Sequence, residues 1–295
     1  YRAVHPALDL CQKPSRDCPH NEPLPFQRYY LLKELAPVDL STFRIASNKS
    51  TEGSVIANYT LSGKINASHF IKAGATYQTI FFNAHSSGYS TQHGKYINEL
   101  NVNNSTAGLF QSFIAWQFRP TDRVTINSGV HYEYFLLNAT WVLEPRLGVR
   151  FKLSPKQNIS VGYGMHSQLQ PTIFYFYENY LPATDSYYKS NRNLDLSKSQ
   201  HAIINYDYNF ANGIRFKFET YYQYLYNIPV QRNQSTSFSM INEGNALEGL
   251  VLVDSLVNKG DGKNYGLEFT LEKHFSKHYY FLTTATVYQS KYKGS

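Results

Sequence analysis

The sequence of 295 residues lacks any run of about 18 apolar residues, the length that a helix needs to cross a bilayer. It contains only two methionines, and its mean hydropathy is negative. These shortages exclude a helical membrane protein and argue against a core of packed helices.

Cysteine is almost absent, with Cys11 and Cys18 in a short segment that also contains prolines. No histidine spacing typical of a zinc site accompanies them. If this segment faces the cell exterior or the periplasm, we predict a disulfide between Cys11 and Cys18 that closes a small loop. Two free thiols in an irregular loop are the alternative, and neither state indicates catalysis.

Clustered positive charge is absent as well. The formal net charge is +7, but Lys and Arg are scattered singly along predicted strands, which argues against a nucleic-acid partner. The segment 259–263 lacks the glycine spacing of a phosphate-binding loop and leads into a predicted strand. No Ser–His–Asp set or carboxylate pair has supporting context. We therefore predict a protein that is not an enzyme and needs no metal or cofactor.

Two histidine patterns have simple structural explanations. His85 and His93 flank a loop rich in serine and glycine, and we predict that they are solvated rather than metal ligands. His131 and Glu133 lie two residues apart on one strand face, where a structural hydrogen bond explains them better than a proton relay.

Aromatic residues are abundant at 16% of the chain, and they follow a pattern. Alternate residues of segment 213–226 give an apolar face with Phe216, Phe218 and Tyr222 and a charged face with Arg215, Lys217 and Glu219. The segment is about twice as long as an ordinary strand of 5–6 residues. A long strand with lipid on one side and water on the other is typical of an outer-membrane β-barrel.

The same alternation recurs in about ten strands that form five hairpins. We predict strands at 54–65, 69–82, 106–118, 123–136, 143–153, 158–168, 198–210, 213–226, 263–275 and 279–292. Tight turns alternate with longer connections, including predicted loops at 83–104, 170–194 and 228–258. The fold class is therefore predicted as all-β, an antiparallel transmembrane β-barrel. A soluble β-sandwich binding module is the alternative, although its strands would be shorter.

The rhythm of turns also predicts how the chain divides. Residues 1–52 are expected to form an extracellular loop region, and residues 53–295 the barrel strands and loops. Both chain ends fall on the long-loop side, whereas complete bacterial barrels of this type begin and end on the short-turn side. Because unpaired strand edges are not tolerated in lipid, we expect further strands on both sides and an incomplete barrel here.

Three segments resemble TonB-dependent outer-membrane transporters, and the strand endings are most similar to the Bacteroidetes branch. The first is 144–150, followed by Tyr163, Gly164 and Pro171. The second is the Asn-x-Asn-Leu element at 191–194, in which Arg192 stands where proline is common. The third is 258–260 followed by 264–268. The resemblance extends over most of 123–295.

This resemblance implies a 22-strand barrel closed by an N-terminal plug, with uptake driven by TonB and the proton-motive force. The plug and the TonB-contacting segment are absent from this sequence. Expected partners are outer-membrane lipid, the TonB complex through the missing N-terminal region, a nutrient ligand and, as a further candidate, a surface lipoprotein. The expected location is the bacterial outer membrane.

Two groups of residues are candidates for function. Aromatic and basic side chains of the loop after residue 170 are candidate ligand contacts, namely Phe174, Tyr175, Tyr177, Tyr180, Tyr187, Tyr188 and Arg192. Some of these rings fit an interfacial aromatic girdle equally well. A second group should face the lumen and line a substrate path or contact the plug: Arg146, Arg150, Lys152, Arg215, Lys217, Glu219, Glu268 and Glu272. A wetted wall that needs only polarity is the simpler explanation of these charges.

The leading hypothesis is a receptor that binds a scarce nutrient at its outer loops and imports it. Siderophore, haem, vitamin, peptide and glycan all fit the sequence. A passive porin or a barrel enzyme is the runner-up.

Overall fold

The computed structural model describes residues 46–90, 95–181, 186–210, 213–233, 238–241, 255–276 and 278–294. Cys11, Cys18 and His93 lie outside these residues, as do the side chains of Tyr180 and Tyr187. Within the described part, no helix is long and apolar enough to cross a membrane.

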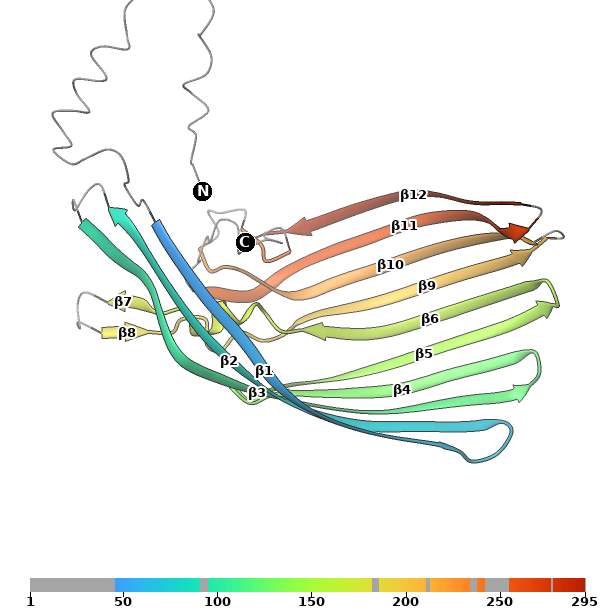
Figure 1. Cartoon of the computed structure of the whole chain (residues 1–295), viewed down its shortest axis with the longest axis horizontal. Coiled ribbons are helices and arrows are strands. Elements are labelled where there is room, and N and C mark those ends of the chain that lie inside the picture. The colour runs from blue at the N-terminus through green and yellow to red at the C-terminus, as the bar shows by residue number, and fades with distance from the viewer. Residues whose placement is uncertain are drawn as a thin grey trace, which may run out of the picture. The chain divides into compact units, whose positions relative to one another are not determined.

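The described chain forms one curved, ten-stranded antiparallel sheet (Figure 1). Neighbouring strands follow the order β1-β2-β3-β4-β5-β6-β9-β10-β11-β12, so each pairs with the next one along the barrel wall. Their bounds are β1 Ala46–Lys64, β2 His69–Ser90, β3 Lys95–Thr121, β4 Val124–Phe135, β5 Thr140–Ser154, β6 Gln157–Gln168, β9 Ser197–Asn209, β10 Ile214–Gln231, β11 Leu256–Ser276 and β12 Tyr279–Lys293. The predicted all-β fold of about ten antiparallel strands is confirmed. A β-sandwich would need two packed sheets and does not fit.

The tight turns lie where the sequence places them. Between β1 and β2, the Asn66 side-chain oxygen accepts hydrogen bonds from the backbone N–H groups of Ser68 and His69, both at 2.9 Å. This Asx turn holds the chain reversal in place. At the turn before β10, Gly213 has a φ of +71°, a conformation that glycine adopts without strain.

The predicted loop at 83–104 is wrong. β2 continues to Ser90 and β3 begins at Lys95, with register pairs from Ala84–Val102 to Ser90–Lys95. Strand β11 likewise begins at Leu256, well before the predicted start. The sequence of these extensions has no regular alternation of apolar and polar residues, so alternation does not reveal them, whereas backbone pairing needs no apolar face.

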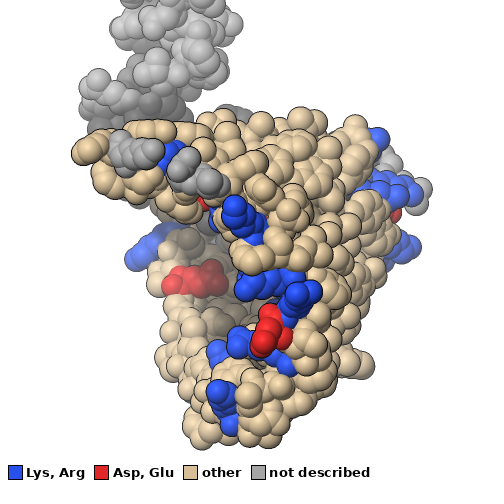
Figure 2. All heavy atoms as spheres, turned by 90° about the vertical axis from the view of Figure 1, so that its right-hand side faces the viewer, with Lys and Arg blue, Asp and Glu red and all other residues tan. Residues whose placement is uncertain are grey.

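The register separates two faces of the sheet. Every strand contributes an exposed large apolar residue to the outer face: Val55, Tyr77, Ile114, Val130, Leu147, Val161, Ile204, Tyr222, Leu267 and Val287. The inner face carries polar residues, as in the cross-strand row of Thr125, Arg150, Ser160, Asn205, Glu219, Glu268 and Thr286. Figure 2 looks onto the end with the hairpin turns and shows charged side chains around a hollow. This division suits lipid outside and water inside.

Aromatic rings stack at two levels of the outer face. Near the turns, His69 stacks with Trp116 and Phe118, with ring centroids 5.6 and 4.7 Å away. Midway along β10 and β11, Tyr222 stacks with Tyr265 on the neighbouring strand. Amphipathic rings at two levels are what membrane–water interfaces select on a barrel.

The connection between β6 and β9 folds back over the inner face. It contains a short helix, α2 (Thr172–Phe176), and a small hairpin of β7 (Asn179–Leu181) and β8 (Ser186–Tyr188). The helix follows Pro171, whose fixed φ suits the position before a first helical turn. Its side chains join a buried cluster that includes Phe82, Leu109, Phe135, Phe174, Tyr175, Phe176, Leu194 and Leu256. The main apolar core thus lies inside the curve of the sheet, at the loop end.

Candidate functional site on the inner face

The eight charged residues predicted for the lumen share the inner face. Cross-strand register pairs Arg150 with Ser160, Glu219 with Glu268, and Arg215 with Glu272. Arg146 and Lys152 have the same strand parity as Arg150, and Lys217 the same as Glu219. Whether these side chains line a transport path stays a prediction.

Near the turns, the inner charges neutralise one another. Arg215 contacts Asp207 on β9 and lies 3.7 Å from Glu272 on β11, measured from Nη1 to Oε2. Lys217 pairs with Glu219, which also accepts a hydrogen bond of 3.0 Å from Asn205 Nδ2. Partly exposed pairs of this kind contribute at most about 1 kcal/mol each, so they serve polarity more than stability.

Three of the predicted residues have no such partner. Among the residues that the structure describes, Arg150, Lys152 and Glu268 make no ion pair. Their charged groups are left to water or to a group outside the described chain.

Nearer the loops, a buried carboxylate organises the inner face. The Glu144 side chain is only 2% exposed. It accepts hydrogen bonds from Arg146 Nη2 at 2.7 Å and from the Ser167 hydroxyl at 2.6 Å, and His131 Nδ1 lies 3.0 Å away. A buried charge is tolerated only with such partners, so this set fixes the relative positions of β4, β5 and β6.

The structural hydrogen bond suggested for His131 has a different partner from the expected one. Glu133, two residues along the same strand, accepts instead from Gln111 Nε2 at 2.8 Å. Both acids lie on the inner face, but cross-strand neighbours are closer to a side chain than residues two apart on its own strand.

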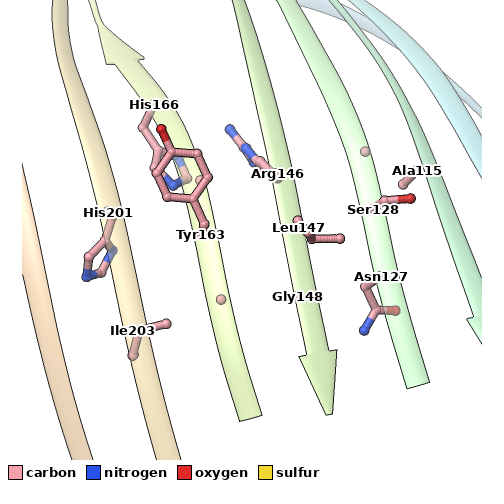
Figure 3. Close-up of a pocket in the computed structure, with 13 residues that line it drawn as sticks. Ala115, Asn127, Ser128, Arg146, Leu147, Gly148, Tyr163, His166, His201 and Ile203 are labelled. Atoms are coloured by element: carbon pink, nitrogen blue, oxygen red, sulfur yellow. The ribbon is translucent and has the colours of Figure 1, made fainter. Parts of the chain in front are cut away.

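Next to Glu144 lies a shallow depression of about 380 Å³ (Figure 3). Two adjacent cross-strand rows form it: Gly129, Arg146, Gly164 and His201, then Asn127, Gly148, Gly162 and Ile203. Four glycines therefore leave the wall without side chains at these positions of three neighbouring strands, β4, β5 and β6. The imidazole of His166 lies over Gly164. A Cβ atom at that glycine would be only 3.0 Å from His166 Nε2.

Two of the segments used for the family resemblance meet at one point. Asp195 N–H donates to Asn258 Oδ1 at 2.9 Å, and Asn258 Nδ2 donates back to the Asp195 carbonyl at 3.1 Å. Asn258 also donates to the Asn227 carbonyl, and Leu256 N–H donates to Asn191 Oδ1, each near 2.9 Å. This asparagine junction of Asn191, Asp195, Asn227 and Asn258 ties the folded loop to β10 and β11.

One protein family matches nearly the whole chain. The model of the TonB dependent receptor-like β-barrel matches residues 21–294. The chain belongs to this family. No curated protein matches the sequence.

Solved structures agree with this receptor-barrel assignment. The FrpB iron transporter from Neisseria meningitidis is 14% identical, with a TM-score of 0.57, over 83% of this chain and 36% of that one. The copper transporter OprC is 9% identical, with a TM-score of 0.59, over 83% and 39%. The RagAB peptide transporter is 12% identical, with a TM-score of 0.53, over 84% and 30%. The chain thus spans well under half the length of these structures, and such low identities show the fold alone.

The receptor barrel places the candidate ligand residues in different environments. Phe174 and Tyr175 are each 1% exposed and pack in the core cluster, and the Phe135 ring lies 5.0 Å from that of Tyr175. Their burial favours packing over ligand contact. Tyr177 is partly buried beside the cluster, whereas Tyr188 and Arg192 are exposed. Ligand contact by Tyr188 and Arg192 stays a prediction.

Sequence reasoning missed several residues of this receptor barrel. Glu144 belongs to a segment that resembles the family, but no sequence pattern predicts that Ser167 and His131 contact its carboxylate. His166, His201 and the four glycines come together only through the strand register. In the sequence, the two rows that contain them extend over 76 positions, from Asn127 to Ile203. The spacing of Gly162, Gly164 and His166, alternate residues of one strand, is the one local signal.

Proposed function

We propose that this receptor barrel works in a bacterial outer membrane as an active-transport receptor. It would bind a scarce nutrient at its outer loops and import it with energy from TonB. The observation that carries the proposal is the two-faced sheet of a family member: an exposed apolar outer face between two aromatic levels, and a charged inner face.

The candidate substrate classes overlap in part with those of similar structures. Similar structures include transporters of iron, copper and peptide, and a siderophore receptor, PirA from Pseudomonas aeruginosa, has a TM-score of 0.58 at 12% identity. We keep siderophore, haem, vitamin, peptide and glycan as candidates. Exposed Tyr188 and Arg192 offer an aromatic surface and a cation at the loop end, which suits amphipathic or anionic ligands.

The proposal includes three partners besides the nutrient. Outer-membrane lipid would cover the apolar outer face. The TonB complex would act through the region N-terminal to this sequence, and a surface lipoprotein is a further candidate at the loop end.

The test is energised uptake by cells that express the full-length protein. Cells with and without its gene would receive labelled candidate nutrients, with a protonophore and a TonB deletion as parallel arms. We expect uptake that needs the gene, TonB and the proton-motive force. Uptake that needs the gene but is unchanged by the protonophore and by the TonB deletion would indicate a passive porin instead.

A further inference from the structure

We propose that the depression beside Glu144 is a binding site for an organic carboxylate on the inner wall of the barrel. The inference rests on the proposed transport function, and it names a chemical class that this part of the wall recognises. The carboxylate could come from a solute in the lumen or from an acidic side chain of this protein outside the described residues. The shared chemistry is the same in both cases.

The rim of the depression supplies hydrogen-bond donors. Arg146 stands between Gly129 and Gly164, His201 stands beyond Gly164 on β9, and His166 bends over Gly164 (Figure 3). The Arg146 side chain is 48% exposed and uses one nitrogen, Nη2, to hold Glu144. A guanidinium has five N–H donors, so donors remain for a second carboxylate.

The floor selects an organic anion over a bare inorganic one. Backbone of Gly148 and Gly162 and the side chain of Ile203 form it, and they offer carbon rather than donors, because strand N–H groups are used in the sheet. A carboxylate attached to carbon can place its carbon against this floor and its oxygens against the rim. A free phosphate would need donors on every side.

The depression distinguishes Arg146 from the other inner cations: Arg150 and Lys152 make no ion pair within the described chain, but neither of them lines the depression. Towards the turns, Arg215 and Lys217 are neutralised by Asp207 and Glu219. Arg146 is also paired, but its partner is buried below the rim while the guanidinium reaches the lumen. The depression is therefore the place where an exposed arginine, two histidines and free volume coincide in the described wall.

The test uses the full-length protein in detergent with succinate as the probe and succinamide as its uncharged counterpart. Calorimetry is expected to show succinate binding and no succinamide binding. Arg146→Gln and His201→Gln should each weaken binding by about tenfold, since each removes a donor to a charged group. Lys156→Gln, which removes one charge at the turn after β5, should leave the affinity unchanged.

Because Arg146 also holds Glu144, a second variant separates structure from recognition. Gly148→Val fills the floor, where an added Cβ would meet nothing closer than 4.0 Å. It should abolish succinate binding while the detergent-folded fraction stays at the level of the unmodified protein. Succinate binding that survives all three inner-wall variants, or succinamide binding of equal strength, overturns the proposal.

Carbethoxylation of histidines, read by mass spectrometry, distinguishes the two sources. A solute site predicts that His166 and His201 react freely and that succinate protects them. If the carboxylate comes from the protein itself, succinate should not bind, and His166 and His201 should be protected without it. The two histidines should then become reactive in Arg146→Gln but not in Lys156→Gln. If succinate does not bind, two results overturn the site. One is that His166 and His201 react freely, and the other is that their protection is unchanged in Arg146→Gln. Energised uptake is measured separately, so either proposal can fail alone.

Discussion

Glu144 and its neighbours show how single residues set the inner wall. The carboxylate is buried, so its free energy depends on Arg146, Ser167 and His131 rather than on water. We predict that Glu144→Gln lowers the free energy of unfolding by about 1–3 kcal/mol, because a charged acceptor is replaced by an amide that cannot satisfy all three donors. Denaturant unfolding of the detergent-folded protein measures this loss.

Glu268→Gln is the matched control for that change. Glu268 is an inner-face glutamate that makes no ion pair within the described part of the chain. The same substitution there should stay within about 0.5 kcal/mol of the unmodified protein. Equal losses at both sites would show that the Glu144 contacts add nothing to stability.

Tyr175 predicts a pH dependence at the folded loop. Burial raises the pKa of its hydroxyl well above the ordinary value of about 10, because the phenolate would lose its hydration in the core cluster. A raised pKa means that the stabilisation is complete below pH of about 10 and is lost as the pH rises further. Limited proteolysis of segment 169–196 should therefore accelerate above that pH.

Tyr175→Phe tests the cause of this alkaline effect. The ring keeps its packing, and the variant loses only the long hydrogen bond of 3.3 Å from Gln170 N–H. Proteolysis at pH 8 should be nearly unchanged, while the acceleration above pH of about 10 should shrink. An unchanged alkaline profile would assign the effect to another group.

At the scale of elements, the asparagine junction holds the loop between β6 and β9 against the wall. Asn258 contributes three hydrogen bonds, two to Asp195 and one to Asn227. We predict that Asn258→Ala frees residues 191–197 and raises their amide hydrogen exchange by about tenfold or more, without preventing barrel assembly. Hydrogen-exchange mass spectrometry on the folded protein gives the readout.

Asn264→Ala provides the comparison on the same strand. Asn264 bonds Gln223 and Ser290 within the sheet and does not touch the loop. Its loss should leave exchange at 191–197 unchanged. If both variants loosen the loop equally, β11 as a whole rather than the junction holds it.

The same elements explain how far the sequence could predict the structure. Strands with one apolar and one polar face, such as β10, are recognisable from the alternation of their residues, and the sequence predicts all ten. The extensions of β2 and β3 beyond Phe82 and Ser105 show no regular alternation of apolar and polar residues, although Ala84 and Val102 on them are buried in the core cluster, so the sequence gives no strand signal there. The sequence predicts 170–194 as an aromatic loop with candidate ligand contacts, yet aromatic composition alone does not distinguish a ligand surface from a core.

At the scale of the whole molecule, the sheet sorts its side chains by solvent. Exposed large apolar residues occur on every strand of the outer face, while the cross-strand row through Arg150, Asn205 and Glu268 is polar. Apart from the core cluster at the loop end, the described inner face is polar, and the exposed large apolar residues lie mainly on the outer face. The candidate site follows the same logic, because its charges and glycines belong to the inner face and appear only when the register joins four strands.

This sorting predicts opposite responses to the same substitution on the two faces. Arginine at Leu147, Val161 or Phe218 should lower stability in the membrane by about 2–4 kcal/mol each, because it places a charge in lipid. Arginine at Ser160, Asn205 or Thr270, all on the inner face, should cost less than about 1 kcal/mol, because water or a neighbouring acid can solvate it. The folded fraction of full-length protein in outer membranes, read from heat-sensitive gel mobility, measures both sets. Equal tolerance of arginine on the two faces would contradict the assignment of lipid to the outer face, and with it the transport role proposed for the inner one.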